Sequence, residues 1–472
     1  MSGQFVVPLI INGEDVRSKE TFPIVNPRTG ETLWQAASAT TDQANAAAAA
    51  GQAAFPAWSQ MTYLARRDVL LKAADVMEEH LEELKRYDCE EMGAEMWWAT
   101  FDTATAMAMI RDVAGRISSI EGTLTRTLEP GSMAMVMKIP YGVVFGITPW
   151  NAACLSAVRC IIYALAAGNT VVLKSSELST RLHFLIGDCF RKAGCPPGVV
   201  NVIAHSREAG PAVIGALIEH PAIRKINFTG STAVGKILAQ QAAKAMKPIL
   251  LELGGKAPMI VLEDADLKEA AHGAAFGANF NAGQNCMATE RIIVIESVAK
   301  EFEEVLKATY AELYPDSYQP QPAVQLAGAN KVKSLVDEAL ATGSEIMFGK
   351  KPEGGQVMHP IILKNTQNSK IHYDETFGPS VNFVVVPSVE AAIEAANDTV
   401  YGLTAAIWSK DLAKALKVAT QIESGAVHIN HITVHDDLTL PHGGVKESGM
   451  GRFGASWGIN EFLTLKSITF KI

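Results

Sequence analysis

The sequence predicts an α/β protein with two doubly wound domains. Short apolar strands alternate with amphipathic helices, which is the spacing of parallel strand–helix units. This alternation restarts after Glu252, which indicates a second sheet. A chain of 472 residues also exceeds the size at which a single hydrophobic core stops growing.

The N-terminal part of the chain mixes strand and helix patterns. The stretch FVVPLIING is typical of a strand, and residues 26–30 form a turn. Helical periodicity covers Thr41 to about Ala114. From about Ile120 to Ile139 this periodicity fades, and GSMAMVMKIP alternates as a strand does. The C-terminal EFLTLKSITFKI looks like one last strand.

Between these ends, strands and helices follow one another regularly. In the first domain, strands are expected at 142–147, 170–174, 198–204 and 225–230, and helices at 152–168, 179–194, 212–219 and 231–243. In the second domain, strands are expected at 257–262, 291–296 and 380–386, and helices from Leu267, at 301–313 and at 389–398. The domain boundary is therefore expected near Glu252.

The composition argues against several classes of function. A net charge of −9 is unsuited to a nucleic-acid surface and gives no reason to expect an anionic membrane as partner. Six scattered cysteines do not make a disulfide framework. No CxxC pair or Cys/His cluster indicates zinc, so no metal is expected.

The apolar segments favour a cytoplasmic protein. The run from Ala152 to Leu173 contains Arg159, Gly168 and Asn169, so it is interpreted as a buried helix plus a strand and not as a membrane span. The N-terminal MSGQFVVPLIINGEDV has neither the apolar core of a signal peptide nor the Arg-rich character of a transit peptide.

Two residues stand out as candidates for catalysis. Cys286 lies in a Gly/Asn-rich turn whose N–H groups can stabilise a thiolate, although a single cysteine is more often a small buried hydrophobe. Glu252 directly follows an apolar strand and precedes two glycines, a position that delivers a general base to a cleft. The alternative for Glu252 is an ion pair with Lys256.

Two segments indicate a nucleotide site. KINFTGSTAVGKILAQ places Gly230 and Gly235 where a phosphate approaches a helix N-terminus, although tight helix–strand packing is the alternative. Because Ile237 replaces the hydroxyl of a P-loop and the middle glycine of GxGxxG is missing, neither common motif applies. Lys174 and Glu177 follow a strand, where ribose hydroxyls are bound; the alternative is a solvated charged loop. A carboxylate at Glu177 would repel a 2′-phosphate, which favours NAD over NADP.

Together these segments resemble the aldehyde dehydrogenase superfamily over nearly the whole chain. The motifs that match are VNPRTGE, ITPWN, LKSSELS, FTGSTAVG, LELGGKAP, FNAGQNC, ETFGPS, YGLTAAIWS and GGVKESGMGRFG. The separation of 34 residues between Glu252 and Cys286 is also that of the family. The resemblance implies an enzyme that oxidises an aldehyde to a carboxylic acid with NAD as cofactor, NADP being less favoured.

The resemblance assigns roles to individual residues. Cys286 would attack the carbonyl and carry the acyl group as a thioester, while the Asn151 amide and the Cys286 N–H would hold the oxyanion. Glu252 would activate the hydrolytic water and would also deprotonate Cys286 earlier. The residues implied in cofactor binding are Ile147, Thr148, Trp150, Lys174, Glu177, Gly230, Ser231, Leu253, Glu375 and Phe377.

The resemblance also implies the domain organisation. Residues 1–119 and 140–251 would form a Rossmann-like NAD-binding domain, and residues 252–440 the catalytic domain. Residues 120–139 and 441–472 would form a small β oligomerisation arm and the C-terminal segment. A homodimer or homotetramer is expected.

Within the superfamily, the chain looks most like the salicylaldehyde, benzaldehyde and vanillin dehydrogenases. Salicylaldehyde enzymes carry an arginine near the substrate at the position of Arg159, and NHITVHDDLTLPHGGVKESGMGRFGASWGINEF resembles aromatic-aldehyde members. We expect Arg159, Trp98 and Tyr163 to contact the substrate. The alternatives are a structural ion pair for Arg159 and helix-core packing for Trp97 and Trp98.

Two histidines depart from the pattern of the family. His442 and His431 stand where many relatives carry phenylalanine and glycine, which predicts a shifted substrate range.

The sequence leaves other functions open. An aliphatic-aldehyde or succinate-semialdehyde dehydrogenase is the main alternative. A CoA-acylating enzyme is disfavoured by the presence of Glu252. A crystallin-like structural protein is disfavoured because Cys286 and Glu252 are retained.

Overall fold

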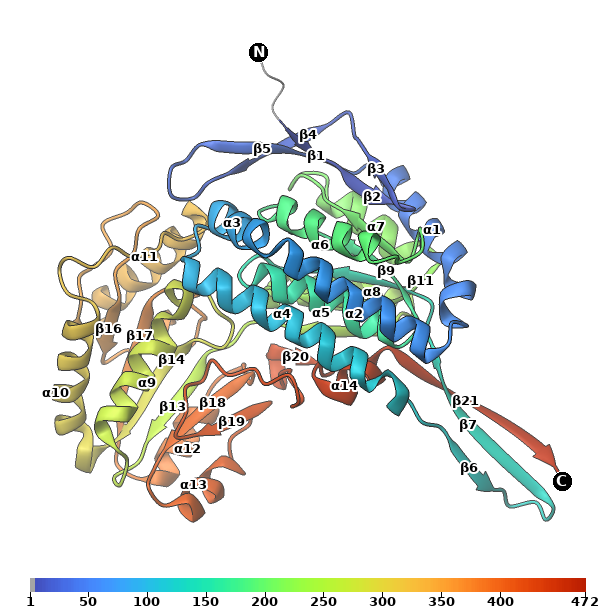
Figure 1. The fold of residues 1–472 in the computed structure, drawn as a ribbon. Helices are drawn as coiled ribbons and strands as arrows, with labels where there is room; N and C mark the ends of the chain where they lie inside the picture. The colour runs from blue at the N-terminus through green and yellow to red at the C-terminus, as the bar shows by residue number, and fades with distance from the viewer. Residues whose placement is uncertain (1–4) are drawn as a thin grey trace.

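The computed structural model describes residues 5–472. Two α/β units lie side by side, and a narrow three-stranded sheet projects from one of them (Figure 1). Helices cover both faces of each large sheet, so the predicted fold class is confirmed. The N-terminal stretch that we interpreted as lacking a targeting signal begins in residues 1–4, which lie outside the described residues.

The first unit is built on an eight-stranded sheet in the order β20-β12-β11-β8-β9-β10-β2-β3. The five strands from β12 to β10 are parallel, and the strands at the two edges are antiparallel to their neighbours. The bounds are β2 (Leu9–Ile11), β3 (Glu14–Val16), β8 (Val143–Ile147), β9 (Thr170–Lys174), β10 (Val200–Ile203), β11 (Ile223–Thr229), β12 (Ile249–Glu252) and β20 (Gly449–Met450).

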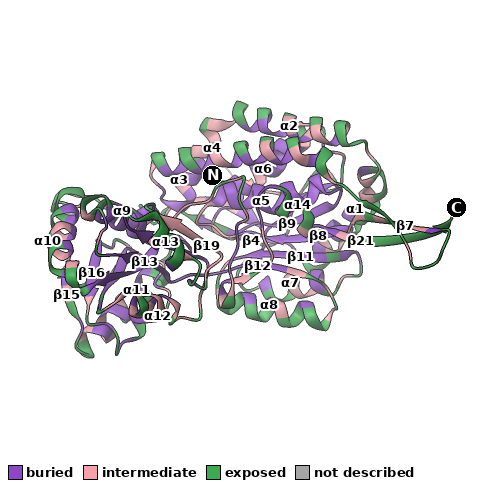
Figure 2. Cartoon of the chain, turned by 90° about the horizontal axis from the view of Figure 1, so that it is seen from below, coloured by how far each residue is buried: buried purple, intermediate pink, exposed green. Residues whose placement is uncertain are grey.

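Helices form layers on both faces of this sheet (Figure 2). On one face α5 (Ala153–Ala166) and α6 (Thr180–Lys192) contact the strands, and α2 (Tyr63–Glu79), α3 (Leu81–Met92) and α4 (Met96–Arg116) pack on them. On the other face lie α1 (Thr41–Ser59), α7 (Gly210–Glu219) and α8 (Thr232–Lys244). Every residue of α5 is buried, as predicted for the apolar run. Within residues 5–472, no helix has the length and apolar character needed to span a membrane.

A buried carboxylate fixes the start of α5. This helix has no side-chain N-cap of its own. Asp102, on α4, instead accepts hydrogen bonds from the backbone N–H groups of Cys154 at 2.8 Å and Leu155 at 3.1 Å. Burial raises the pKa of Asp102 to about 6. This cap fixes the start of the helix that carries Arg159.

The second unit is built on a seven-stranded sheet in the order β15-β16-β17-β14-β13-β18-β19. Its strands are β13 (Ala257–Val261), β14 (Thr289–Ile295), β15 (Glu345–Phe348), β16 (Ile361–Lys364), β17 (Ser380–Val386), β18 (Thr404–Trp408) and β19 (Ala426–Ile429). The helices are α9 (Leu267–Asn279), α10 (Glu296–Leu313), α11 (Leu326–Ala341), α12 (Val389–Asn397) and α13 (Leu412–Ala419). Alternate residues of β13 point to opposite faces, so Met259 packs toward α9 and Ile260 toward α12.

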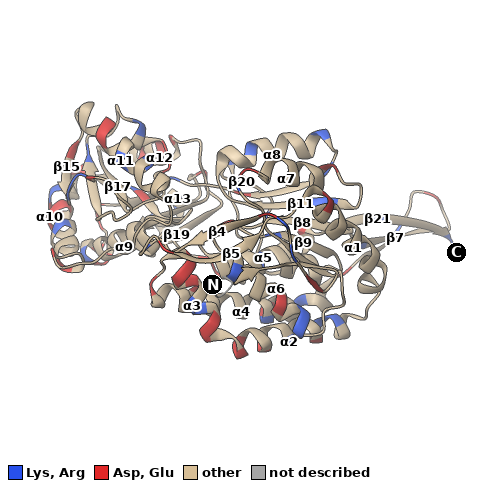
Figure 3. Ribbon diagram, turned by 90° about the horizontal axis from the view of Figure 1, so that it is seen from above, with Lys and Arg blue, Asp and Glu red and all other residues tan. Residues whose placement is uncertain are grey.

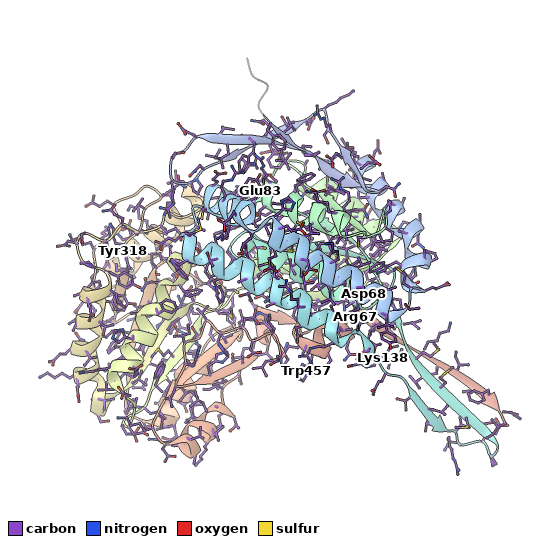
Figure 4. All side chains as sticks on the ribbon, in the orientation of Figure 1. Arg67, Asp68, Glu83, Lys138, Tyr318 and Trp457 are labelled. Carbon is purple, nitrogen blue, oxygen red and sulfur yellow. The ribbon has the colours of Figure 1, made fainter. Side chains whose placement is uncertain are left out.

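The projecting sheet joins two distant parts of the chain. Strand β7 (Ser132–Pro140) pairs with β6 (Thr123–Arg126) and with β21 (Leu463–Lys471), both antiparallel. The strand patterns of residues 131–140 and of the C-terminus are thereby confirmed. At the base, Lys138 Nζ donates to Asn460 Oδ1 at 2.8 Å, next to Trp457 on α14 (Ala455–Glu461) (Figure 4).

The opening strand differs from its prediction. FVVPLIING does not form one strand, because β1 (Val6–Val7) and β2 belong to different sheets. Strand β1 pairs with β5 (Thr32–Ala37), which also pairs with β4 (Thr21–Val25). Pro8 stands between β1 and β2, and it has no N–H for a continuous ladder.

A buried ion pair joins the residue before β13, strand β14 and a loop of the second unit. Lys256 Nζ lies 2.6 Å from Glu290 Oε2, and their side chains are only 1% and 2% exposed. Lys256 also donates to the carbonyl of Asp374 at 2.7 Å. Glu290 accepts the N–H groups of Thr376 and Phe377. The loop that contains Glu375 is therefore anchored from both sides.

We expect Glu290→Gln to lower the free energy of unfolding by about 3–5 kcal/mol, because Lys256 would keep a buried charge without an anionic partner. The matched control is Glu447→Gln at the more exposed Lys236–Glu447 pair, where the loss should stay below about 1 kcal/mol. Chemical denaturation measures both variants. Equal, small losses would contradict this role of the buried pair.

Candidate active site

The carboxyl edge of the first sheet gathers several of the predicted site residues. Lys174, Ile147, Thr229 and Glu252 end the neighbouring strands β9, β8, β11 and β12, in that order across the sheet. The chain runs from β8 to β9 and β10 on one side and then crosses to β11 and β12 on the other. Ligands of such sheets bind at the edge where the direction of winding reverses.

A cavity opens at this edge, and we call it the edge cavity. Six predicted cofactor residues line it together with the three predicted catalytic residues: Trp150, Gly230, Ser231, Leu253, Glu375 and Phe377, with Asn151, Glu252 and Cys286. Ile147, Thr148, Lys174 and Glu177 are not in its lining. Lys331, on α11, lines it and was missed, since nothing in its sequence context marks it.

The two glycines of the strand–turn–helix segment have different roles. Gly230 lines the edge cavity. A Cβ at Gly235 would lie 2.6 Å from a methyl carbon of Leu253, so Gly235 permits α8 to pack closely on the segment after β12. The packing alternative thus applies to Gly235 and also to Gly230, where a Cβ would lie 2.5 Å from the Phe228 ring. Ser231 caps α8 by accepting the N–H of Val234, and the helix N-terminus favours a negative charge nearby.

Lys174 and Glu177 form a pair just beyond β9. Lys174 Nζ lies 3.4 Å from Glu177 Oε2, and the lysine is buried while the glutamate is partly exposed. Thr148 is held beside them because its N–H donates to the Lys174 carbonyl at 3.3 Å. The two charged groups therefore present a cation and an anion together at the same strand end.

Glu375 is a half-buried carboxyl group in the wall of the edge cavity. It accepts the N–H of Gly255 at 2.9 Å, and a Cβ at Gly254 would lie 2.6 Å from its oxygens. Burial, followed by the charge of Glu290, raises the pKa of Glu375 to about 7. Near neutral pH this group can accept or donate a hydrogen bond.

Cys286 and Glu252 are in direct contact. The Cys286 thiol donates to Glu252 Oε1 at a distance of 3.2 Å. Burial raises the pKa of the Cys286 thiol well above its ordinary value, and the negative charge of Glu252 is the second largest cause. The thiol therefore needs a base to become a nucleophile, and Glu252 is in reach. The alternative that Glu252 pairs with Lys256 is wrong, because Glu290 holds that lysine.

A left-handed turn presents the thiol. Asn281, Ala282 and Gly283 have φ values of 52°, 55° and 69°, which is uncommon for residues with a Cβ. The Asn151 amide lies beside this turn and donates to the Gln284 carbonyl at 3.1 Å. Asn281 in turn donates to the Asn151 carbonyl at 2.9 Å. These bonds hold the amide close to the thiol.

A second cavity, which we call the aromatic cavity, shares Asn151, Glu252 and Cys286 with the edge cavity. Aromatic and apolar side chains dominate its remaining wall: Trp98, Phe101, Ala152, Leu155, Phe280, Met287 and Val434. Trp98 meets Phe280 edge-on, with ring centroids 5.0 Å apart. Trp97 is outside the lining and 44% exposed, but its ring also meets Phe280 at 5.0 Å. Phe101 was missed, although it follows Trp98 by three positions on one helix face.

Arg159 lines the aromatic cavity but has a protein partner. Its guanidinium forms an ion pair with Asp436 and lies over the ring of Phe453. Burial lowers the pKa of Arg159, but the charges of Asp436 and Glu252 raise it more. Of the two alternatives for Arg159, the ion pair is present. The sequence alone did not identify Asp436 as the partner of Arg159.

Tyr163 is not brought to the aromatic cavity. It is fully buried, and its hydroxyl accepts the N–H of Gly454 at 3.1 Å. A Cβ at Gly458 would lie 2.6 Å from its ring, so the ring packs beneath α14. Tyr163 follows Arg159 by four residues on the same helix face, but the rise of about 6 Å carries it past the cavity.

The two unusual histidines separate in the structure. His442 lines the aromatic cavity and is buried. His431 is exposed, and its ring centroid lies 4.4 Å from that of His435.

Among residues 5–472, no group of three His, Cys, Asp or Glu side chains is arranged to hold a metal ion. Acidic and basic side chains are interspersed over the outer helices (Figure 3).

The chain matches one protein family along nearly its whole length. The model of the aldehyde dehydrogenase family matches residues 15–468. A vanillin dehydrogenase from a Pseudomonas species is 43% identical, covering 99% of this chain and 98% of its own length. The NADP-dependent succinate-semialdehyde dehydrogenase of Escherichia coli is 34% identical, with 98% of each chain covered. The crystal structure of a salicylaldehyde dehydrogenase from Pseudomonas putida G7 with salicylaldehyde has a TM-score of 0.96 at 37% identity, covering 99% of this chain and 98% of that one.

We expect Glu252→Gln to lower the pKa of the Cys286 thiol, because it removes the negative charge that raises this pKa while leaving an amide oxygen that can still accept from the thiol. The rate of alkylation by iodoacetamide, followed from pH 6 to pH 11 in the free protein, measures the thiolate fraction. Cys286→Ala corrects for the other cysteines. A midpoint that stays in place or rises in Glu252→Gln would show that the carboxylate does not govern this thiol.

Proposed function

The chain belongs to the aldehyde dehydrogenase family and is an NAD(P)-dependent aldehyde dehydrogenase, and we propose that it oxidises aromatic aldehydes with NAD⁺. One observation carries this proposal. The Cys286 thiol lies in contact with Glu252 in the wall shared by the edge cavity and the aromatic cavity. A nucleophile in this position can meet an aldehyde from one side and a nicotinamide from the other.

The residues of the edge cavity fit a dinucleotide. Gly230 and Ser231, at the N-terminus of α8, would hold the pyrophosphate. Glu375 would bind the nicotinamide ribose, with Phe377 beside it, and the position of its carboxyl group next to Gly254 and Gly255 supports this assignment. When bound, NAD⁺ accepts the hydride. Lys174 and Glu177 would hold the adenosine ribose, while Ile147, Thr148, Trp150 and Leu253 would complete the site.

Acylation would begin with proton transfer from Cys286 to Glu252. The thiolate adds to the aldehyde carbonyl and forms a tetrahedral carbon that bears an oxyanion. The Asn151 amide and the Cys286 N–H would stabilise this oxyanion, and one such donor typically contributes on the order of 10²–10³ in rate. Loss of hydride from this carbon leaves an acyl group on Cys286 as a thioester.

Hydrolysis would complete the reaction. Glu252 takes a proton from water, the hydroxyl oxygen bonds to the acyl carbon, and the C–S bond breaks. The products are the carboxylic acid and the free thiol after Cys286 regains a proton. Because Glu252 reaches Cys286 directly, water can serve as the acyl acceptor and coenzyme A is not needed.

The wall of the aromatic cavity supports an aromatic substrate. Trp98, Phe101 and Phe280 can contact a flat ring edge-on or face-on. The vanillin and salicylaldehyde dehydrogenases among the relatives are named for aldehydes of this kind. A succinate semialdehyde would bring a carboxylate, and Asp436 already occupies the buried guanidinium of Arg159. Arg159 would therefore shape the substrate site together with Asp436.

The arm formed by β6, β7 and β21 supports an oligomer. Apolar side chains on these strands are exposed in the single chain: Leu124, Met135, Met137, Leu465, Ile468 and Phe470. Burying them against a second copy would remove them from water, so we propose a homodimer or homotetramer.

We also propose that residues 1–119 and 140–251 bind the cofactor and that residues 252–440 supply the thiol. A cytoplasmic location stays a prediction.

A panel of aldehydes read by NADH absorbance tests the proposed function. We expect kcat/KM for salicylaldehyde, benzaldehyde and vanillin to exceed that for succinate semialdehyde and hexanal by at least about 10-fold, in line with the contribution of ring contacts. Cys286→Ala should abolish turnover of every aldehyde. A preference for succinate semialdehyde would overturn the substrate class, and turnover by Cys286→Ala would overturn the thioester route.

Glu177→Ala tests the cofactor preference. Removing the carboxylate deletes an acceptor for ribose hydroxyls and relieves repulsion of a 2′-phosphate. We expect the KM for NAD⁺ to rise and the KM for NADP⁺ to fall, while kcat with saturating cofactor changes little. An unchanged ratio of the two KM values would contradict the role of Glu177.

A further inference from the structure

Glu252 has two tasks in the proposed reaction, and this inference rests on that proposed function. It removes the proton of the Cys286 thiol before acylation, and it removes a proton from water during hydrolysis. A carboxylate holds only one of these protons. Glu252 must therefore lose the first proton before it can accept the second, while the acyl group still occupies the site.

His442 is placed to receive that proton. Its Nε2 lies 3.7 Å from Glu252 Oε1, and its Nδ1 lies 3.6 Å from Asp436 Oδ1. The side chain is only 7% exposed, and Nε2 has no hydrogen-bond partner among residues 5–472. A small rotation of either side chain brings Nε2 within hydrogen-bond distance of Glu252.

The backbone holds the imidazole in this position. The N–H of His442 donates to the Phe453 carbonyl at 3.0 Å, and the N–H of Phe453 donates to the His442 carbonyl at 2.7 Å. This pair of bonds forms an isolated bridge between two loop segments. Because both bonds involve only main-chain atoms, the side chain can be replaced without breaking the bridge.

Charged groups of both signs surround His442. The groups that face His442 are Glu252 from β12, Asp436 from its own loop and His428 from β19, and Arg159 from α5 lines the same cavity. Two carboxylates against one guanidinium leave one negative charge without a partner. Burial raises the pKa of Asp436, but Arg159 and His442 lower it more, so this carboxylate stays ionised. A proton transferred from Glu252 to His442 therefore lies between two carboxylates, at 3.7 Å from Glu252 Oε1 and 3.6 Å from Asp436 Oδ1.

We propose that His442 accepts the thiol-derived proton from Glu252 and so returns Glu252 to the carboxylate form before hydrolysis. In this step the O–H bond on Glu252 breaks, an N–H bond forms on Nε2, and no electrons are transferred. Glu252 then accepts the proton of the attacking water. When the C–S bond breaks, the proton on Glu252 returns to the Cys286 sulfur, with which it is in contact. The proton on His442 and that of the carboxylic acid product pass to solvent, which regenerates neutral His442, ionised Glu252 and the free thiol.

The test separates NADH formation from hydrolysis in the full-length enzyme. His442→Gln keeps the volume and polarity of the side chain but cannot accept a proton. After rapid mixing with an aromatic aldehyde and NAD⁺, this variant should keep a burst of NADH, since Glu252 can still take the first proton. Its steady-state rate should fall by about 10²-fold, the low end of what a positioned proton acceptor contributes.

A second variant provides rescue. His442→Ala leaves space for a small base, and free imidazole should restore most of its steady-state rate, with a pH dependence that follows the neutral form of the added imidazole. His431→Gln, in the same C-terminal segment but exposed, is the matched control and should retain the original rate and burst. Thermal unfolding curves establish that all three variants are folded.

Each outcome bears on the inference. An unchanged steady-state rate in His442→Gln would overturn it. So would a burst and a steady-state rate that fall together and do not respond to imidazole, because His442 would then act only through packing. Absence of NADH formation by the unmodified enzyme across all aldehydes would instead refute the proposed function.

Discussion

The contact between Cys286 and Glu252 is the constraint on which the rest of the site depends. The thiol belongs to the turn between α9 and β14 in the second unit, whereas the carboxylate ends β12 in the first. The two backbones approach so closely that a Cβ at Gly255 would lie 2.3 Å from the Cys286 carbonyl oxygen. Any residue larger than glycine there would push the thiol away from its base. The contact between Cys286 and Glu252 therefore requires this close approach of the two units.

Two buried charge clusters keep this contact in place from opposite sides. Lys256 and Glu290 tie the segment after β12 to the loop that carries Glu375, on the side of the edge cavity. Arg159 and Asp436 tie α5 to the C-terminal loops, on the side of the aromatic cavity. Buried charges such as these are costly to leave unpaired, so each cluster resists separation of the segments that it joins. The site is thereby preorganised between the edge cavity and the aromatic cavity.

Much of the fold followed from local patterns, since period-2 and period-3.6 patterning marks buried strands and helices directly. The elements around β8, α5, β9 and β11 were predicted close to their observed positions. The opening strand was not, because Pro8 divides it between two sheets that no local pattern could separate. The pairing of β7 with β21 joins residues more than three hundred positions apart, and only long-range packing selects such partners.

By itself, the sequence determined which chemical groups are available and how they are spaced: a thiol in a glycine-rich turn, a carboxylate at a strand end, an amide and a buried guanidinium. The tertiary structure alone decided which of them meet. Tyr163 packs under α14, although it shares a helix face with Arg159. Arg159 pairs with Asp436 and not with the neighbouring Asp437. His442 lies between the carboxylates of Glu252 and Asp436. The physical reason is that residue type and periodicity specify a face and a chemistry, whereas contact depends on the distance and angle between elements, which are fixed by packing across the whole chain.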